Sequence, residues 1–472
     1  MNNFVKTKIV CTIGPSCNSP AMIESLIEAG MNVARLNFSH GTLSSHETHI
    51  KNIRAIAERL KKPVAIIQDL SGPKIRISSL SKESVTLKAN DLFTLTNRNV
   101  EDDEKTASVN YALLHEIVFI DDAILLNDGV IELKVVQKNN TDIICRVVVG
   151  GELTVGKGLN IPGRSLPIPS LTEKDLRDLD FGIRQEVDYI ALSFVKNVND
   201  VLQLKKLIQQ KNKDIPVIAK IEKHEALNDL ENIIKTADAI MVARGDLGVE
   251  IPLERIPIVQ KKIIRLANTF CKPVITATQM LESMVHNYRP TRAEVTDVAN
   301  AIFDGTDAVM LSEETAKGRY PVEAVHMLSK IAREVEPCLS RKNNFEAPHS
   351  PNNPISVPDA ISIATCQVAD NLDIKAIITS TQTGSTARFI SKYRPQHLIL
   401  AVTPSLNTYK RLSLVWGVIP MLTEPMQNTD DMMKKAIEAA KAAGYISEKD
   451  RVAITGGVPV WEPGSTNLLR IY

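Results

Sequence analysis

Several features that mark other protein classes are scarce or absent in this chain of 472 residues. Its six cysteines form no Cys-x-x-Cys pair, and so few thiols in a long chain are typical of a reducing compartment. No hydrophobic run reaches membrane-spanning length, and the N-terminal segment MNNFVKTKIV lacks the apolar core of a signal peptide. The sequence therefore predicts a cytoplasmic protein with free thiols.

An excess of charge of either sign is also missing. Lys and Arg number 56 against 55 Asp and Glu, which leaves a formal net charge of +1. Without a basic surface, neither a nucleic acid nor an anionic membrane is an expected partner. The apolar content of 44% and charged content of 24% are those of a globular protein, and the length predicts two or three domains.

What the chain does contain is a recurring unit, a short and continuously apolar segment followed by a segment with helical periodicity. Continuous hydrophobicity is typical of parallel strands that helices cover on both faces. Eight such strands are expected, at Lys8–Gly14, Met31–Ser39, Val64–Leu70, Asp188–Val195, Pro216–Glu222, Ala239–Gly248, Pro273–Met280 and Asp307–Thr315. Eight strand–helix units predict an α/β fold of the (β/α)8 TIM barrel type.

The barrel pattern is interrupted once, between its third and fourth strands. Residues 71–168 carry short alternating strands, turn signals and little helix, which predicts an inserted all-β domain. The insert begins where a barrel strand ends, so we expect it to act as a lid, with hinges at Gly72-Pro73 and Pro167-Ile168-Pro169. Residues 1–70 and 169–342 would then be the two parts of the barrel domain.

A Pro- and Asn-rich stretch, Asn343–Pro358, has the composition of a linker and introduces a third domain at 343–472. Its strands and helices alternate again, which predicts a C-terminal α/β domain with an open, mostly parallel sheet. The loop Thr381–Thr386, TQTGST, lies between a strand and a helix N-terminus, a place that favours a phosphate. An ordinary Ser/Thr cap explains this loop about as well.

Polar side chains gather at the expected C-terminal ends of the barrel strands, the face that holds the active site in barrels of this kind. They are Arg35, Asn37, Ser39, Asp69, Ser193, Lys220, Glu222, Asp246, Thr278, Gln279, Ser312, Glu313 and Glu314. Lys220 and Glu222 lie two apart in one strand and so share a face. With Asp246 from the next strand, they form a cation beside a two-carboxylate site for a divalent metal. An isolated Lys-x-Glu is more often a structural ion pair, and only the gathering of the other residues reverses that interpretation.

No Cys/His pair or Ser-His-Asp set stands out as an activated nucleophile in this sequence. A metal site, fixed cations such as Arg35 and Arg76, and backbone donors are the components of phosphoryl transfer or of enolate stabilisation. His40 follows Ser39 in a loop, where it either contacts a ligand or lies on the surface. From the residues alone, a metal-dependent phosphotransferase and a metal-dependent carbon–carbon lyase both remain open.

The segments TKIVCTIGPSC, MNVARLNFSHG, DLSGPKIR, GKGLNIPG, AKIE, VARGDLGVE, TATQMLESM and RPTRAEVTDVANAIFDGTDAVMLSEETAKGRYPVEAV resemble the pyruvate kinase family, in order and along the whole chain. The resemblance implies phosphoryl transfer from phosphoenolpyruvate to ADP, giving pyruvate and ATP in the last step of glycolysis. It also implies a Mg²⁺ or Mn²⁺ cofactor. A lyase would not need the nucleotide contacts, and a sensor that had lost catalysis would have lost Lys220, Glu222, Asp246 or Thr278.

The same resemblance implies roles for individual residues. Glu222 and Asp246 match the metal ligands, and the Gly245–Asp246 backbone matches the group that holds the substrate carboxylate. Lys220 matches the lysine that stabilises the transferring phosphoryl group and the enolate. Thr278 matches the residue that positions the proton for the enolate carbon.

Further matches concern phosphates. Arg35 matches a phosphate-binding arginine, and Asn37, His40, Arg76 and Lys157 match nucleotide contacts.

One departure from the family concerns its monovalent cation. Members that need K⁺ bind it with residues matching Asn37, Ser39, Asp69 and Leu70, and they carry Glu where this chain has Lys74. The ammonium of Lys74 would replace K⁺, so we expect activity without K⁺. The alternative is that Lys74 points to solvent and K⁺ still binds, because the other ligands remain.

The resemblance also extends to regulation and assembly. The family's third domain binds phosphorylated small-molecule activators, and Thr381, Thr383, Gly384, Ser385 and Thr386 match its phosphate loop. A homotetramer is the expected assembly.

Overall fold

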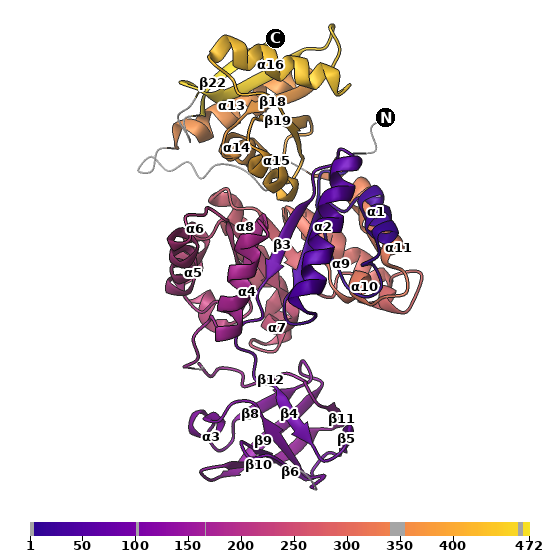
Figure 1. The fold of residues 1–472 in the computed structure, drawn as a ribbon, viewed down its shortest axis with the longest axis vertical. Helices are drawn as coiled ribbons and strands as arrows, with labels where there is room; N and C mark the ends of the chain where they lie inside the picture. The colour runs from indigo at the N-terminus through magenta and orange to yellow at the C-terminus, as the bar shows by residue number, and fades with distance from the viewer. Residues whose placement is uncertain (1–3, 101–102, 166, 340–354, 461–465) are drawn as a thin grey trace.

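The computed structural model describes residues 4–100, 103–165, 167–339, 355–460 and 466–472. Three bodies follow one another along the long axis of the molecule, with the barrel in the middle, the inserted domain at one end and the C-terminal domain at the other (Figure 1). Of the predicted linker, residues 343–354 lie outside the described part of the chain. The domain limits at 70/71 and 168/169 remain predictions, and the limit at 342/343 lies outside the described residues as well.

The central domain is a closed barrel of parallel strands in the order β1-β17-β16-β15-β14-β13-β3-β2. Its strands are β1 (Lys8–Thr12), β2 (Val33–Asn37), β3 (Ala65–Asp69), β13 (Tyr189–Leu192), β14 (Val217–Ile221), β15 (Ala239–Ala243), β16 (Val274–Ala277) and β17 (Ala308–Leu311). Each lies within one of the eight segments expected from the sequence, so the predicted barrel is confirmed.

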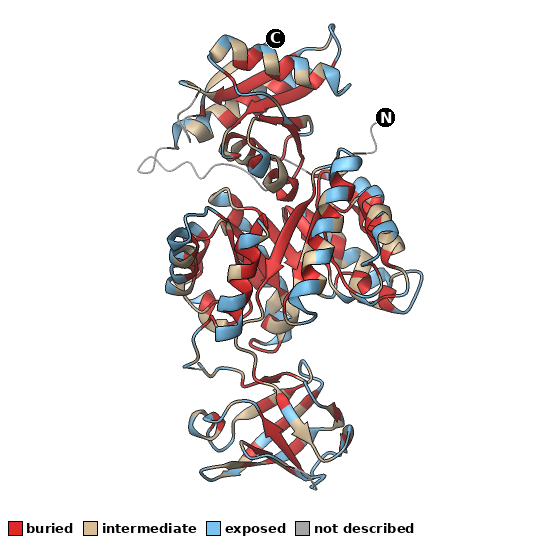
Figure 2. Cartoon of the chain, in the orientation of Figure 1, coloured by how far each residue is buried: buried red, intermediate tan, exposed pale blue. Residues whose placement is uncertain are grey.

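Helices surround the barrel (Figures 1 and 2). They are α1 (Pro20–Ala29), α2 (Leu43–Arg59), α4 (Glu173–Arg184), α5 (Val198–Gln210), α6 (Leu230–Thr236), α8 (Ile256–Thr269), α9 (Arg292–Phe303) and α11 (Pro321–Val335). Capping boxes at Thr42, Thr172, Asn197 and Thr291 begin α2, α4, α5 and α9, because a side-chain oxygen there accepts from the first free N–H groups. Two shorter helices, α7 (Arg244–Gly248) and α10 (Glu313–Ala316), follow β15 and β17 at the carboxyl end.

Successive residues of a barrel strand belong to two different cores. On β3, for example, Ile66 packs outward against the helices while Ala65 and Ile67 fill the barrel interior. This explains why the strands read as continuously apolar, since both of their faces are buried. Leu414 from the C-terminal domain belongs to the interior cluster, so that domain closes the amino end of the barrel.

In its described residues, the insert between β3 and α4 is all-β apart from the one-turn helix α3 (Leu114–Ile117), as predicted. A seven-stranded sheet has the order β12-β8-β9-β10-β6-β7-β4, and β11 pairs with β5. The strands are β4 (Ile77–Leu80), β5 (Ser84–Leu87), β6 (Leu92–Thr96), β7 (Thr106–Val109), β8 (Ala123–Leu126), β9 (Ile131–Lys138), β10 (Asp142–Val149), β11 (Gly151–Thr154) and β12 (Leu159–Asn160). A core around Phe93 and Leu133 stabilises this domain separately from the barrel.

The two ends of the insert meet at one side chain. Asp175, in the first turn of α4, accepts from Gly72 N with Oδ1 at 3.1 Å. Its Oδ2 accepts from Thr172 N at 2.9 Å. One carboxylate therefore holds both the segment that leaves the barrel and the segment that returns to it.

The C-terminal domain has a five-stranded sheet in the order β20-β19-β18-β21-β22, parallel except for the last strand. Its elements are α13 (Val357–Asn371), β18 (Ala376–Ser380), α14 (Ser385–Lys392), β19 (Leu398–Thr403), α15 (Leu406–Arg411), β20 (Val418–Leu422), α16 (Thr429–Ala442), β21 (Val452–Gly457) and β22 (Thr466–Ile471). This confirms the predicted open α/β sheet. Among the described residues, no helix is long and apolar enough to cross a membrane.

Buried polar contacts attach this domain to the barrel. The Arg394 guanidinium donates to Asp307 Oδ1 at 3.0 Å and to Gly305 O at 2.6 Å, and its side chain is only 2% exposed. Lys8 in β1 donates through Nζ to Val418 O of β20 at 2.7 Å. The interface therefore contains buried charges that pair across the two domains.

Candidate active site

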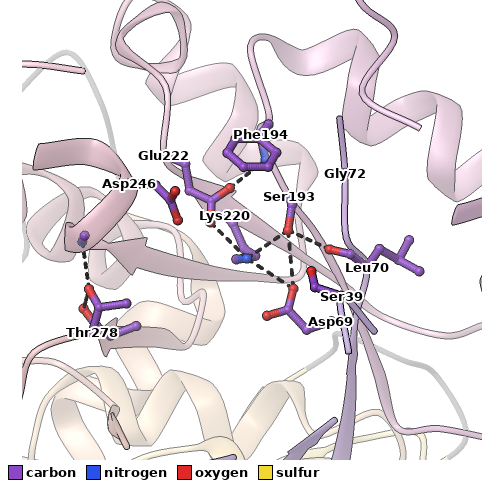
Figure 3. A network of polar contacts seen from close by, with 12 residues as sticks. Ser39, Asp69, Leu70, Gly72, Ser193, Phe194, Lys220, Glu222, Asp246 and Thr278 are labelled. Atoms are coloured by element: carbon purple, nitrogen blue, oxygen red, sulfur yellow. Dashed lines mark hydrogen bonds and ion pairs between the residues drawn. The ribbon is translucent and has the colours of Figure 1, made fainter. Parts of the chain in front are cut away.

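Three of the predicted polar residues at the carboxyl end of the barrel, Asp69, Ser193 and Glu222, contact Lys220, the fourth residue of β14 (Figure 3). Its Nζ lies 2.9 Å from Glu222 Oε1, 3.2 Å from Asp69 Oδ1 and 2.8 Å from Ser193 Oγ. Strand geometry accounts for the first contact, because residues two apart share a face. Ser193 follows the adjacent strand β13, and Asp69 ends β3, the strand beyond it, so the barrel brings both to the same edge.

Burial of the Lys220 side chain would lower its pKa, but the charges of Asp69 and Glu222 outweigh burial and raise the pKa above its ordinary value. The group is therefore a permanent ammonium ion in a site shielded from water. A fixed cation of this kind stabilises negative charge that develops on a substrate.

Glu222 and Asp246 lie side by side at the ends of β14 and β15 (Figure 3). Burial raises the pKa of Glu222, against the effect of the Lys220 charge, and Asp246 raises it further. Burial would also raise the pKa of Asp246, but the Lys74 ammonium at 2.9 Å from its Oδ1 holds that pKa below its ordinary value. Two neighbouring carboxylates at adjacent strand ends, that of Glu222 buried and that of Asp246 partly exposed, are a donor set that fits a divalent cation.

Phe194 and Ser193, which directly follow β13, position both members of the central pair. Phe194 N donates to Glu222 Oε2 at 2.7 Å, while Ser193 Oγ accepts from Lys220 and donates to Leu70 O at 2.7 Å. The sequence analysis placed Ser193 on this face but did not find the contribution of Phe194. A backbone N–H leaves no signal in the amino-acid type.

Thr278 and Gly245 form the other wall of the site. Thr278 Oγ1 accepts from Gly245 N at 2.8 Å and donates to Ala277 O at 2.6 Å. Thr278 has a φ of +67°, a left-handed conformation that a β-branched residue rarely adopts. Strain of this kind gathers at functional sites, where the surrounding structure holds it.

Arg35, the third residue of β2, is joined to Lys220 through a shared carboxylate, that of Asp69. Its Nε lies 2.6 Å from Asp69 Oδ2, and its Nη1 donates to Thr12 Oγ1 at 2.9 Å. Burial would raise the pKa of Asp69, but Lys220 and Arg35 together hold it below its ordinary value. Thr12 was missed by the sequence analysis, although its place at the end of β1 is the available signal.

The insert brings further cations to this edge. Burial lowers the pKa of His40, and the charge of Arg76 from the insert lowers it further, so His40 is neutral at physiological pH. Arg76 donates through Nη1 to Gly156 O at 2.8 Å, and its backbone pairs with Gly158. Lys157 lies between those two glycines, and its carbonyl accepts from Ile77 N at 2.9 Å. The charge of Arg76 in the insert thus acts on His40 in the barrel.

The insert also contacts the barrel through Glu250. Glu250 Oε1 accepts from Asn160 Nδ2 of β12 at 3.3 Å and from Lys223 Nζ at 2.5 Å. Its Oε2 lies 3.1 Å from His224 Nδ1. Glu250 therefore links the segment that follows Glu222 to the insert.

Lys74 does not lie where the sequence analysis expected it. Its ammonium pairs with Asp246 Oδ1 and, at 3.4 Å, with Asp128 Oδ1 of the insert, rather than with Asn37, Ser39 or Asp69. The ammonium beside the loop that follows β2 is that of Lys174, which donates to Phe38 O at 2.6 Å and to Ser71 Oγ at 3.3 Å. Sequence reasoning missed Lys174, because it lies in an ordinary first helical turn.

The predicted cation positions do gather near this loop. Ser39 N donates to Asn37 Oδ1 at 3.1 Å, and Leu70 O and Asp69 Oδ1 both face Ser193. The backbone and side-chain oxygens needed for a monovalent cation are thus close together at the ends of β2 and β3.

The predicted effector loop lies in the C-terminal domain, beyond the other end of the barrel. Thr381 Oγ1 accepts from Gly384 N at 2.9 Å, and Gly384 has a φ of +82° as N-cap of α14. Thr386 Oγ1 lies 2.8 Å from Thr466 Oγ1, and Thr383 Oγ1 donates to Ser385 Oγ at 3.3 Å. Both interpretations of the loop, phosphate cradle and ordinary cap, are compatible with these contacts.

Comparison with known proteins gives consistent matches along the chain. Residues 4–325 match the family model for the pyruvate kinase barrel domain, and residues 359–472 match the model for the pyruvate kinase alpha/beta domain. The chain is 48% identical over 470 residues to pyruvate kinase 2 of a Synechocystis species, covering 99% of this chain and 79% of that protein. It is 46% identical over 469 residues to a pyruvate kinase of Staphylococcus aureus, covering 99% of this chain and 80% of that protein.

Solved structures agree with the sequence matches. A crystal structure of a pyruvate kinase from Cryptosporidium parvum superposes with a TM-score of 0.91 at 39% identity, covering 99% of this chain and 96% of that one.

Proposed function

The chain belongs to the pyruvate kinase family, and we propose that it transfers the phosphoryl group of phosphoenolpyruvate to ADP, giving pyruvate and ATP as the last step of glycolysis. The observation that carries this proposal is the buried Lys220 ammonium, which lies between Asp69 and Glu222 beside Asp246. A permanent cation next to two carboxylates suits the handling of a phosphoryl group better than it suits covalent catalysis.

The residues of the barrel edge bind and orient the substrate. The Gly245–Asp246 backbone receives the substrate carboxylate. Thr278 Oγ1 lies beside this backbone, since it accepts a hydrogen bond from Gly245 N, and so it also approaches the carboxylate. Arg35 and Lys220 receive the phosphate, and both are held in place by Asp69. Membership of the family implies a divalent metal, and Glu222 and Asp246 would hold Mg²⁺ or Mn²⁺, which when bound neutralises phosphate charge.

Transfer breaks the bond between the enol oxygen and phosphorus and forms a bond from phosphorus to a terminal oxygen of ADP. Lys220 stabilises the charge on the moving phosphoryl group and then on the enolate oxygen that remains. A proton positioned by Thr278, through water, then adds to the enolate carbon and completes pyruvate.

The nucleotide is bound between barrel and insert by Asn37, His40, Arg76 and Lys157. The effect of the Arg76 charge on His40 supports this assignment, since one group comes from the insert and the other from the barrel. A metal-dependent lyase, by contrast, has no use for a nucleotide site. The insert would thus act as a lid that excludes water when it closes.

A coupled assay tests the proposal directly. The purified chain is given phosphoenolpyruvate, ADP and Mg²⁺, and both ATP and pyruvate are measured over time. We expect equal amounts of the two products, and none when ADP or the divalent metal is left out. Pyruvate that accumulates without ADP would contradict the proposal.

We further propose that turnover does not require K⁺. Support comes from two ammonium groups near the site, Lys74 beside Asp246 and Lys174 beside Phe38 O and Ser71 Oγ. Activity in tetramethylammonium buffer should equal activity in K⁺ buffer. Two variants, Lys74→Glu and Lys174→Met, then show which ammonium replaces the cation. Only the variant that lacks the replacing ammonium should become K⁺-dependent. Activity of the unmodified enzyme that collapses without K⁺ and returns with it would rule the proposal out.

Regulation and assembly form a separate proposal. We propose that a phosphorylated small molecule activates the enzyme at Thr381, Thr383, Gly384, Ser385 and Thr386, and that the enzyme is a cytoplasmic homotetramer. The N-terminus of α14 at Gly384 supports the loop assignment. Light scattering should give four times the chain mass of 52.0 kDa, and a value for one or two chains would exclude the tetramer.

A further inference from the structure

A histidine and two glutamates converge at the carboxyl end of the barrel. They are His224, Glu225 and Glu250, and one nitrogen or oxygen atom of each lies within 4.8 Å of those of the other two. His224 and Glu225 begin the short 3₁₀ helix η1 (His224–Leu227), which follows β14, while Glu250 lies just beyond α7. None of the three belongs to the pair of carboxylates to which the catalytic metal is assigned.

Both carboxylates approach the same ring nitrogen. His224 Nδ1 lies 3.1 Å from Glu225 Oε2 and also 3.1 Å from Glu250 Oε2. A neutral imidazole that carries its proton on Nδ1 can donate it to only one of these oxygens. The geometry favours Glu250, whose Oε2 forms the hydrogen bond. His224 therefore leaves the other carboxylate, that of Glu225, without a donor.

Glu225 is a carboxylate that points into the protein without being satisfied there. Within the described part of the chain, neither of its oxygens has a hydrogen-bond partner, and both are buried. The side chain as a whole is 17% exposed, so the part that reaches solvent is its hydrocarbon stem. Burying an ionised carboxylate is costly unless it is paired or coordinates a metal. The inward direction of these two oxygens therefore points to a cation as their partner.

Glu250 is held in a position in which one of its oxygens can act as a ligand. Its Oε1 accepts from Lys223 Nζ at 2.5 Å and from Asn160 Nδ2 at 3.3 Å, which leaves Oε2 to face His224. Outer contacts of this kind orient the ligands of metal sites. Lys223 compensates the charge of only one of the two glutamates, so one negative charge of the group remains for a bound cation.

We propose that His224, Glu225 and Glu250 bind a divalent transition-metal ion such as Zn²⁺. Two ligand atoms about 2.0 Å from a tetrahedral zinc ion lie about 3.3 Å apart. The 3.1 Å that separates the imidazole nitrogen from each carboxylate is close to this value. The ion takes the place of the proton on Nδ1 and so serves all three ligands at once.

The ligand types decide which ion fits. Imidazole suits Zn²⁺, Co²⁺ and Ni²⁺, whereas Mg²⁺ is bound by oxygen ligands alone. The group therefore differs in its preferred metal from the carboxylate pair of the candidate active site. The His224 side chain is 25% exposed, which leaves a way in for the ion and room for a water molecule as a further ligand.

A metal ion in this position would strengthen the connection between the barrel edge and the insert. It would tie η1 to the segment after α7, from which Glu250 reaches Asn160 of β12. The inference goes beyond the catalytic proposal and does not depend on it, because it rests only on these ligands and their contacts.

Titration of the full chain with Co²⁺ tests the site, because four-coordinate Co²⁺ absorbs visible light strongly. Excess Mg²⁺ is present throughout to occupy the carboxylate pair of the candidate active site. We expect an absorption band that added Zn²⁺ abolishes. His224→Gln and Glu225→Gln should each weaken this Co²⁺ binding by about tenfold or more, since even changes outside the ligand set of a metal site have effects of that size.

His115→Gln is the matched control. His115 also lies beside the glutamate that follows it, with its Nε2 3.8 Å from Glu116, but it belongs to no group of three metal-ligating side chains in the described part of the chain. This variant should bind Co²⁺ as the unmodified protein does.

Thermal unfolding without added metal shows whether each variant is folded, and a crystal of the unmodified protein soaked in Zn²⁺ gives a measurement that needs no variant. Anomalous diffraction should place the ion about 2.0–2.2 Å from His224 Nδ1 and from an oxygen of each glutamate. Equal Co²⁺ binding by the unmodified protein and both Gln variants would overturn the proposal. So would a zinc ion found only at Glu222 and Asp246 or at a cysteine thiol.

Discussion

Lys220 keeps its charge inside the protein because Asp69 and Glu222 surround the ammonium with two carboxylates. Each carboxylate is in turn held by another group, Asp69 by Arg35 and Glu222 by the backbone N–H of Phe194. The position of the charge is thus fixed before a substrate arrives. This arrangement costs no reorganisation when negative charge develops.

Replacing Lys220 by Met tests its role as the catalytic cation. We expect kcat to fall about a thousandfold or more, because an uncharged side chain cannot stabilise the phosphoryl group or the enolate. Substrate binding, measured by fluorescence or calorimetry, should persist, since Arg35 remains. Lys205→Met, which removes an ammonium paired with Asp238 on the outside of the barrel, is the control and should retain activity. A Lys220→Met enzyme within tenfold of the unmodified rate would contradict the role.

Lys8 presents the opposite case, a buried ammonium that forms no ion pair with a carboxylate among the residues that the structure describes. Its Nζ donates to Val418 O, and burial lowers its pKa to about 7 from the ordinary 10.5, although the charges of Glu336 and Asp307 oppose the shift. Between those two values the unfolded chain binds more protons than the folded one. The free energy of unfolding therefore rises with pH across this window.

The Lys8→Met variant makes this dependence measurable. Met cannot titrate, so the unfolding free energy of the unmodified protein minus that of the variant should increase from pH 7 towards pH 10. The slope should be up to about 1.4 kcal/mol per pH unit. Urea denaturation at several pH values measures it, and a difference that stays constant or falls as pH rises would refute the assignment.

At the scale of elements, the junction between β3 and the insert bears directly on the site. Gly72 has a φ of +63°, and a Cβ added there would lie 2.7 Å from Phe194 Cδ2 and 3.0 Å from Ser193 Cβ. These are the residues that hold Glu222 and Lys220 (Figure 3). The entry to the insert is thus in contact with the residues that position the catalytic pair.

Gly72→Ala should therefore lower kcat by about tenfold or more, since displacing Ser193 and Phe194 misplaces both catalytic groups. Gly163→Ala is the matched control, because Gly163 has a φ of +74° but nothing within 4 Å of its added Cβ. Both variants carry similar backbone strain, of about 1 kcal/mol. Steady-state kinetics of the two variants separate the effect of the steric clash with Phe194 and Ser193 from the effect of backbone strain. An equal loss of kcat in both variants would contradict the proposed clash.

The elements themselves were largely predictable from the sequence, because both faces of the barrel strands are buried and their apolar runs are continuous. Ile66 and Ile67 of β3 illustrate this, since each is fully buried in a different core. The gathering of Lys220, Glu222 and Asp246 was predictable for the same reason, as parallel strands end at one edge. The partner of Lys74 was not, because a long side chain beside several carboxylates can reach more than one. Nor was Phe194 N, since backbone donors are independent of residue type.

At the scale of the whole molecule, the C-terminal domain is attached to the barrel through buried charge. Arg394 pairs with Asp307 at 3.0 Å, and both side chains are nearly inaccessible to water. Leu414 of the same domain enters the barrel interior core. The two domains should therefore unfold together.

Arg394→Met would leave the Asp307 carboxylate buried beside an apolar side chain. We expect a loss of about 3–5 kcal/mol in the stability of the interface, because an unpaired buried charge is strongly destabilising. Differential scanning calorimetry should then resolve two transitions where the unmodified protein has one. Lys392→Met, whose partner Asp359 lies within the C-terminal domain, should keep a single transition. A single, unshifted transition in Arg394→Met would show that the pair does not join the domains.

The meeting of both ends of the insert at Asp175 has a consequence for how such a chain can change over evolutionary time. The carboxylate fixes Gly72 on the way out and Thr172 on the way back, so the sequence between them can lengthen or shorten without moving a barrel strand. Doubling the length of a closed loop costs only about 0.6 kcal/mol. The barrel and its insert can therefore diverge at different rates, except at the insert residues that contact the barrel edge, such as Lys74 beside Asp246 and Asn160 beside Glu250.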